Sequence, residues 1–141
     1  MFGGDPSFGA EEVTPEGKVK KLVAALLAEF NIVNAKDAGR ELQSSGWYFC
    51  PGQNGYGVKG IPDFVGHYLG RSFAVETKAP GKIPTGFQEL QIAEIIRSGG
   101  AVFFIDGSKG VEEVRKFFLE VSIYEYNCRR GELHRVVESS R

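Results

Sequence analysis

The stretch from Ile61 to Lys78 decides the fold, and it reads IPDFVGHYLGRSFAVETK. Two runs rich in β-branched and aromatic residues flank Leu69-Gly70-Arg71, a pattern that predicts two short strands joined by a tight turn. Pro62 lacks an amide hydrogen, which suits the first residue of a strand or a sheet edge. We therefore expect a β-hairpin that begins near Pro62 and ends at Lys78.

Three polar residues of this hairpin have the chemistry of a hydrolytic site. Glu76 and Lys78 are two residues apart in a strand, so their side chains project from one face, with backbones roughly 7 Å apart. Mg²⁺ prefers carboxylate oxygens, which Glu76 and Asp63 offer, and a nearby ammonium offsets charge in the transition state. The spacing by itself favours an ion pair on a solvated sheet face over an active site.

Length and composition restrict the class of protein. The chain has 141 residues, 42% hydrophobic and 25% charged, which indicates a single globular domain. Its net charge of −1 provides no global basic field for nucleic acid. Cys50 and Cys128 have neither metal-ligand nor disulfide spacing. No apolar leader or membrane-length run is found, so we expect a cytoplasmic protein without a membrane partner.

Before the hairpin, residues 1–14 lack periodicity and are expected to be a flexible lead-in. Thr14 and Pro15 are typical of a helix start, and Glu16 suits the positive end of the helix. An apolar stripe predicts that this helix packs on a core; its residues are Val19, Leu22, Val23, Leu26, Leu27 and Phe30. Residues 35–42 are an ambiguous short helix, and Trp47 to Phe49 read as a strand.

After the hairpin, Thr85 is expected to cap a helix over residues 86–98. Its core face is predicted from the apolar residues Phe87, Leu90, Ala93 and Ile96. Ala101 to Ile105 is a continuous apolar run, typical of a buried central strand. A last helix is expected over residues 111–124, and its apolar stripe favours simple packing over the sheet; the stripe is Val114, Phe117, Phe118 and Val121. The alternatives for this locally basic tail are that it lines a DNA groove or packs against a second subunit.

Four lysines are candidate phosphate contacts. Lys18 and Lys21 belong to a basic cluster at the start of the first helix, Lys59 lies in a glycine-rich loop, and Lys82 lies in the loop after the hairpin. Such residues suit phosphate binding, although a solvated surface explains them as well.

At this point the chain resembles the PD-(D/E)xK nuclease superfamily, and within it the virus-type replication-repair nuclease (VRR-NUC) domains. Four motifs in order carry the resemblance: Gly60-Ile61-Pro62-Asp63, then Val75-Glu76-Thr77-Lys78, then Thr85-Gly86-Phe87-Gln88, and Gly99-Gly100 leading into the strand at Ala101 to Ile105. The resemblance covers roughly Pro15 to Asp106.

The resemblance implies an α/β, restriction-endonuclease-like fold, with a small mixed sheet flanked by helices in an αβββαβ core. Residues 15–141 would form one nuclease domain with a C-terminal helical, basic extension. Asp63 and Glu76 would bind Mg²⁺ or Mn²⁺, with the Thr77 carbonyl as a further ligand. Lys78 would position the attacking water.

Two further site residues follow from the same resemblance. Gln88 would reach toward the active site, with Gln91 as a competitor, and Glu16 would be the acidic residue of the first helix, with Glu12 as the alternative. A general-base role for His67 is a minor possibility. The implied function is a metal-dependent DNA endonuclease, structure-specific for branched DNA as a homodimer; the alternative is a non-catalytic nucleic-acid-binding module.

Overall fold

The structure is a computed structural model that describes residues 13–40, 43–52 and 57–139, with side chains as far as residue 129. Most of the expected flexible lead-in, residues 1–14, and the alternative acid Glu12 lie outside the described residues. Among the helices that are described, none is both long and apolar enough to cross a membrane.

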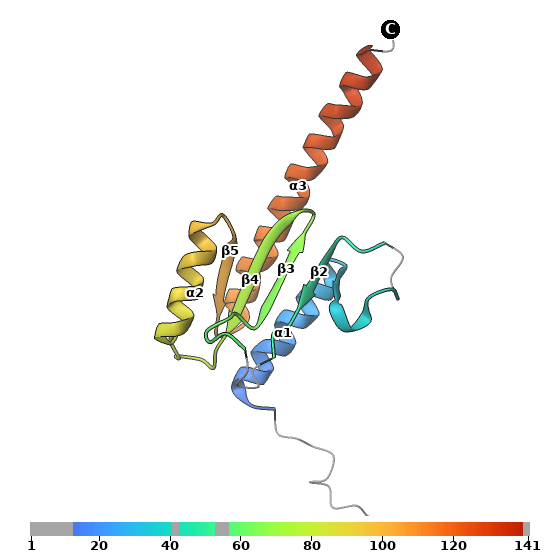
Figure 1. Ribbon diagram of the computed structural model, residues 1–141. Helices are drawn as coiled ribbons and strands as arrows, with labels where there is room; N and C mark the ends of the chain where they lie inside the picture. The colour runs from blue at the N-terminus through green and yellow to red at the C-terminus, as the bar shows by residue number, and fades with distance from the viewer. Residues whose placement is uncertain (1–12, 41–42, 53–56, 140–141) are drawn as a thin grey trace, which may run out of the picture.

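A five-stranded mixed sheet forms the centre of the molecule, with helices on both faces (Figure 1). The strands lie side by side in chain order: β1 (Ile32–Asn34), β2 (Gly46–Phe49), β3 (Phe64–Tyr68), β4 (Arg71–Thr77) and β5 (Ala101–Ile105). The two outer pairs, β1–β2 and β4–β5, are parallel, and the two inner pairs are antiparallel. The chain is therefore of the mixed α/β class.

Helices α1 (Pro15–Glu29) and α3 (Ser108–Ser139) cover one face of the sheet, and α2 (Gly86–Arg97) lies on the other beside β5. The core lies between the sheet and the first pair of helices, around the fully buried Phe118 of α3. The Phe118 ring contacts those of Tyr68 and Phe73 at centroid distances of 5.0 and 5.2 Å. This packing uses the side chains of β3 and β4 that point toward α1 and α3. The side chains on the opposite face of the two strands are not part of this core and remain for the site.

The hairpin prediction is confirmed: β3 and β4 pair from Phe64↔Val75 to Tyr68↔Arg71. Leu69 and Gly70 both have positive φ, 48° and 81°, which is the geometry of a two-residue turn matched to the strand twist. The first strand is shorter than expected. Ile61 to Asp63 precede it as an irregular segment, which frees Asp63 from the strand ladder.

The sheet differs from the expected αβββαβ core in two ways. One additional strand, β1, comes before β2, pairs with it and brings the sheet to five strands. The ambiguous segment after β1 forms only a 3₁₀ turn, Ala35–Asp37, within the described residues. The prediction of β5 as a central strand was wrong, because β5 lies at the sheet edge. It is also not fully buried, because only Ile105 of the strand is buried and Phe104 is 36% exposed.

The predicted core face of α2 was also wrong. Phe87, Leu90 and Ile96 are 56%, 69% and 56% exposed, and Ala93 is exposed too. The half-buried residues of α2 are Gln88, Gln91, Ile92 and Ile95, at spacings of three and four along one side of the helix. On this side of the helix, Gln88 forms a polar contact with β4. A prediction from the positions of apolar residues alone does not detect such a contact.

Two further expectations need correction. Leu22 of α1 is 44% exposed rather than buried with the other apolar residues of that helix. The last helix runs from Ser108 to Ser139, well beyond the expected residues 111–124. Its predicted inward stripe of Val114, Phe117, Phe118 and Val121 does pack toward the sheet.

Candidate active site

Asp63 is held against the end of β4 by the residue after Glu76. The Thr77 backbone N–H and the Thr77 hydroxyl both donate to Asp63 Oδ2, at 2.9 and 2.7 Å. Asp63 is 8% exposed and Thr77 is fully buried. Because one carboxylate oxygen accepts two hydrogen bonds, the orientation of the Asp63 side chain is defined and its Oδ1 faces away from Thr77.

Glu76 lies next to Asp63 and is 2% exposed. Its carboxylate accepts a hydrogen bond from Gln88 Nε2 at 2.8 Å on Oε1. The other oxygen, Oε2, is buried and has no hydrogen-bond partner among the described residues. A buried carboxylate oxygen without a donor is costly, and such an atom points to a ligand or cation that completes it.

The electrostatics of the site follow from this burial. Desolvation, reinforced by the negative charge of Asp63, raises the pKa of Glu76 from 4.5 to about 7. The Lys78 ammonium and the Asp63 N–H act in the opposite direction, and the charge of Glu16 raises the pKa slightly further. Glu76, Asp63, Lys78 and Glu16 thus belong to one electrostatic cluster. A carboxyl that titrates near neutrality in such a cluster is typical of functional sites.

Gln88 connects the first turn of α2 to this cluster. Thr85 caps the helix by accepting from Gln88 N at 3.3 Å, and Gln88 Oε1 accepts from Thr85 N at 2.9 Å. This reciprocal capping box fixes the Gln88 amide, whose Nε2 then points at Glu76. Gln91, the competing candidate, lies one turn further along α2.

Gly60 makes this approach of α2 possible. Its φ is +83°, and a Cβ placed there would collide with the Phe87 carbonyl and crowd the Gln88 nitrogen. The backbone before Asp63 therefore packs directly on the first turn of α2. Both halves of the site, the Asp63 segment and the Gln88 turn, are positioned by the same backbone contact.

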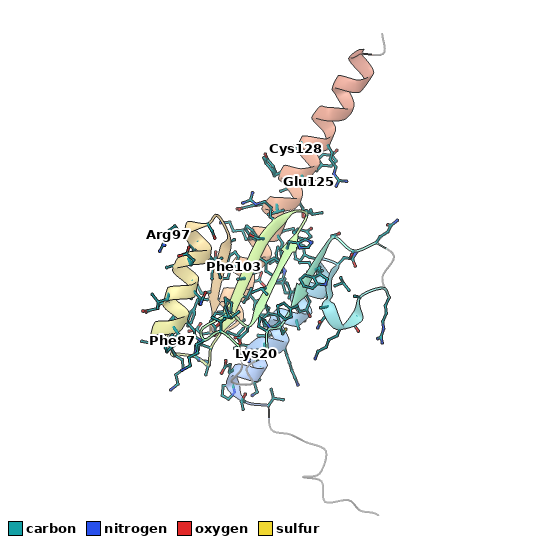
Figure 2. All side chains as sticks on the ribbon, viewed as in Figure 1. Lys20, Phe87, Arg97, Phe103, Glu125 and Cys128 are labelled. Carbon is teal, nitrogen blue, oxygen red and sulfur yellow. The ribbon has the colours of Figure 1, made fainter. Side chains whose placement is uncertain are left out.

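Lys20 of α1 joins the cluster, and sequence reasoning missed it. Its Nζ lies 3.6 Å from Asp63 Oδ1 and 3.9 Å from Glu16 Oε1, so its ammonium is close to both carboxylates. Figure 2 labels Lys20 on α1. The spacing of four residues between Glu16 and Lys20 was an available signal for their pairing. The contact with Asp63 is tertiary and has no counterpart in local sequence.

We expect Lys20→Met to tighten binding of Mn²⁺, because it removes a positive charge that competes with the cation for Asp63. Since the Lys20 side chain is 44% exposed and partly screened, the expected gain is about 3- to 10-fold in affinity. Calorimetric titration with Mn²⁺ measures it. Lys18→Met, an exposed lysine of the same helix, is the matched control. Unchanged or weaker binding by Lys20→Met would contradict this role.

The four lysines expected to contact nucleic acid are exposed in the structure: Lys18, Lys21, Lys59 and Lys82. Lys59 Nζ lies 5.1 Å from the centroid of the Phe87 ring, a cation–π contact at the start of α2. That contact places one positive charge close to the turn that carries Gln88. His67 is exposed and stacks on Trp47, at 6.3 Å between ring centroids.

An exposed aromatic strip, Trp47, Phe49 and His67, lies on the same face of the sheet as Glu76. Trp47 and Phe49 are 38% and 40% exposed, and their rings stack at 6.1 Å. The strand register pairs Trp47 with His67 and Phe49 with Val65, and Val65 pairs with Ala74, two residues before Glu76. Alternation of hydrophobic and polar residues did not single out this strip, because aromatic residues there read equally as core.

A metal ion fits this cluster only as a hard cation. Within the described part of the chain, no three His, Cys, Asp or Glu side chains gather as a metal site by themselves. Asp63 and Glu76 offer two carboxylates, and Glu76 Oε2 is buried without a donor. Two carboxylates, a backbone carbonyl and retained waters suit Mg²⁺ or Mn²⁺, whereas Zn²⁺ requires more nitrogen or sulfur ligands.

Comparison with known proteins adds no relationship: the sequence matches no protein-family model and no curated protein. The assignment of the site therefore depends on its geometry and on the motifs.

Proposed function

We propose that the protein is a divalent-metal-dependent nuclease that hydrolyses phosphodiester bonds of DNA. The observation that carries this proposal is the Glu76 carboxylate, buried beside Asp63 with one oxygen lacking a donor among the described residues. Burying two neighbouring carboxylates costs free energy unless a cation compensates them. A lysine two residues after the buried glutamate, in a strand that ends there, completes the set of groups needed for phosphodiester hydrolysis.

The roles of the residues follow from their positions. Asp63, Glu76 and the Thr77 carbonyl would hold Mg²⁺ or Mn²⁺, which when bound supplies a Lewis acid for phosphate oxygens and lowers the pKa of a water. Thr77 orients Asp63 through two hydrogen bonds, and Gln88 orients Glu76. Lys78 would hold the attacking water and offset negative charge, because its side chain projects from the Glu76 face. Glu16 is a nearby acid whose contact with Lys20 is solvent-accessible.

The proposed fold family is the restriction-endonuclease-like PD-(D/E)xK superfamily, and within it the VRR-NUC type. A mixed sheet with an antiparallel hairpin, the acidic residues at the end of that hairpin and a following helix beside them support this assignment. The extra strand β1 and the long helix α3 are additions to the expected core.

DNA is the proposed substrate, and branched DNA cut by a homodimer is the specific form. The exposed aromatic strip supports substrates that expose unpaired bases, because bases stack on aromatic rings irrespective of sequence. The lysines around the site would contact phosphates, so binding should weaken with salt.

The proposal is tested with a panel of single-stranded, duplex, flapped and four-way branched DNA, incubated with Mg²⁺, Mn²⁺ or EDTA. We expect metal-dependent cleavage by the wild type and its loss in Asp63→Ala and in Lys78→Ala, with both variants folded by circular dichroism. Cleavage by folded variants at the wild-type rate would overturn the proposal. Metal-independent DNA binding without cleavage would identify a binding module instead.

A further inference from the structure

The second half of α3 extends beyond the body of the protein (Figure 1). The last hydrogen bond described between this helix and the sheet joins Ser122 Oγ and Tyr68 Oη, at 2.7 Å. From Ile123 to Ser139 the helix continues for about 25 Å at 1.5 Å per residue. Figure 2 shows Glu125 and Cys128 on this projecting part, away from the strands. In proteins most helix stability comes from packing of an apolar face against another element.

The apolar side of α3 changes where the helix leaves the sheet. The residues that face the core repeat every three or four positions; they are Val111, Val114, Phe118 and Val121. The same line continues with Glu125 and Cys128, so it becomes polar as soon as there is no sheet beneath it. A second apolar line begins at Leu119 on roughly the opposite side of the helix.

This second line, the outer stripe, consists of Leu119, Ile123 and Tyr126 among residues with described side chains. They are 50%, 61% and 64% exposed, which is unusual for three large apolar residues in succession on one helix face. Their spacings are four and three, the heptad repeat of a coiled coil. The sequence continues the repeat at position 130, an arginine, and then with Leu133 and Val137.

We propose that the outer stripe pairs with the same segment of a second copy of the chain, forming a short two-helix coiled coil that makes the protein a dimer. A heptad stripe needs a partner helix of the same period, and a two-fold axis supplies it. Burying Leu119, Ile123 and Tyr126 of each copy, at about 60–120 Å² each, removes on the order of 500 Å², and the repeat that continues in the sequence at Leu133 and Val137 extends the seam toward the area of a specific interface. The net charge of −1 produces little repulsion between copies.

The single charged position in the stripe is consistent with this pairing. One polar or charged residue at a seam position reduces stability but selects register and helix orientation. The interface does not depend on the proposed nuclease activity, because its residues lie on the helix segment farthest from Glu76. It also leaves the exposed face of α2 uncovered.

Two tyrosines of almost equal exposure provide a matched test. Tyr126 lies in the outer stripe and is 64% exposed, whereas Tyr124 is 65% exposed and lies off it. We expect the wild type and Tyr124→Glu to sediment as dimers at 10–100 µM. Tyr126→Glu and Ile123→Glu should sediment as monomers, with dimerisation weakened at least 10-fold. Circular dichroism checks that each variant is folded.

Several results would overturn the proposal. These are a monomeric wild type over the same concentrations, a dimer that survives both Tyr126→Glu and Ile123→Glu, or equal loss of the dimer in Tyr124→Glu. A dimer that survives both stripe substitutions would place the interface on another surface, of which the exposed apolar residues of α2 are the next candidate.

Discussion

Replacing Glu76 by glutamine is expected to stabilise the metal-free protein above neutral pH while nearly abolishing cleavage. Glutamine keeps the size of the side chain and an oxygen that can accept from Gln88 Nε2, but removes the charge that burial disfavours. It would also remove one of the two proposed carboxylate ligands, and metal ions contribute several kcal/mol to phosphodiester hydrolysis. Cleavage should therefore fall about 10²–10³-fold.

The stability effect has a defined pH dependence. The pKa of Glu76 is about 7 in the folded protein, against an ordinary value of 4.5. Between these values the folded protein holds a proton that the unfolded chain has released. The free energy of unfolding therefore falls as pH rises from about 4.5 to about 7, by up to about 3 kcal/mol, and stays low above pH 7.

Urea denaturation in EDTA at pH 5 and pH 8 measures this effect. Glu76→Gln should lose the decrease seen in the wild type and be the more stable protein at pH 8. Glu113→Gln, which changes an exposed carboxylate of α3, controls for the loss of one charge. If the stability of Glu76→Gln depends on pH in the same way as that of the wild type, the pKa of the Glu76 carboxyl is not raised in the metal-free protein.

Replacing Gly60 by alanine is expected to destabilise the protein and, separately, to disturb the site. The added Cβ would meet the Phe87 carbonyl and the Gln88 nitrogen, so the first turn of α2 must move away. That movement withdraws the Gln88 amide from Glu76. We expect a loss of about 3 kcal/mol or more in the free energy of unfolding, combining backbone strain with the collision.

Gly81 is a matched control, because its φ of +80° is almost the same but a Cβ there meets nothing within 4 Å. Gly81→Ala should cost only the backbone strain, about 1–2 kcal/mol, and should leave cleavage unchanged. Thermal or urea unfolding compares the two variants, and cleavage assays at permissive temperature compare their sites. Equal effects of the two substitutions would show that α2 does not constrain Gly60.

The hairpin and its polar residues could be predicted because they depend on local pattern. Alternation, a two-residue turn and the E-x-K spacing are enough to put Glu76 and Lys78 on one face of a strand. The side of α2 that faces the sheet could not be predicted, because Leu90 and Ile96 are apolar and the decisive contact is that of Gln88. Lys20 was missed for a similar reason, since its partner Asp63 is distant in sequence.

The position of β5 shows a different limit. A continuous apolar run is typical of a strand inside a sheet, but β5 lies at the sheet edge, where α2 and α3 contact it and only Ile105 is buried. Sequence pattern does not distinguish this from a strand with neighbours on both sides. The length of α3 was underestimated because its apolar residues change sides after Val121, so a search for one stripe ends there.

The two ends of the Gln88 amide have separate partners, and this restricts which amino acid position 88 can accept. The acceptor end receives the Thr85 N–H, and the donor end serves Glu76. Glutamate retains the acceptor but meets Glu76 with a like charge, and asparagine has both groups on a side chain one methylene shorter. A single planar group thus joins the start of a helix to a buried acid, and the genetic code has only one side chain of that length and polarity.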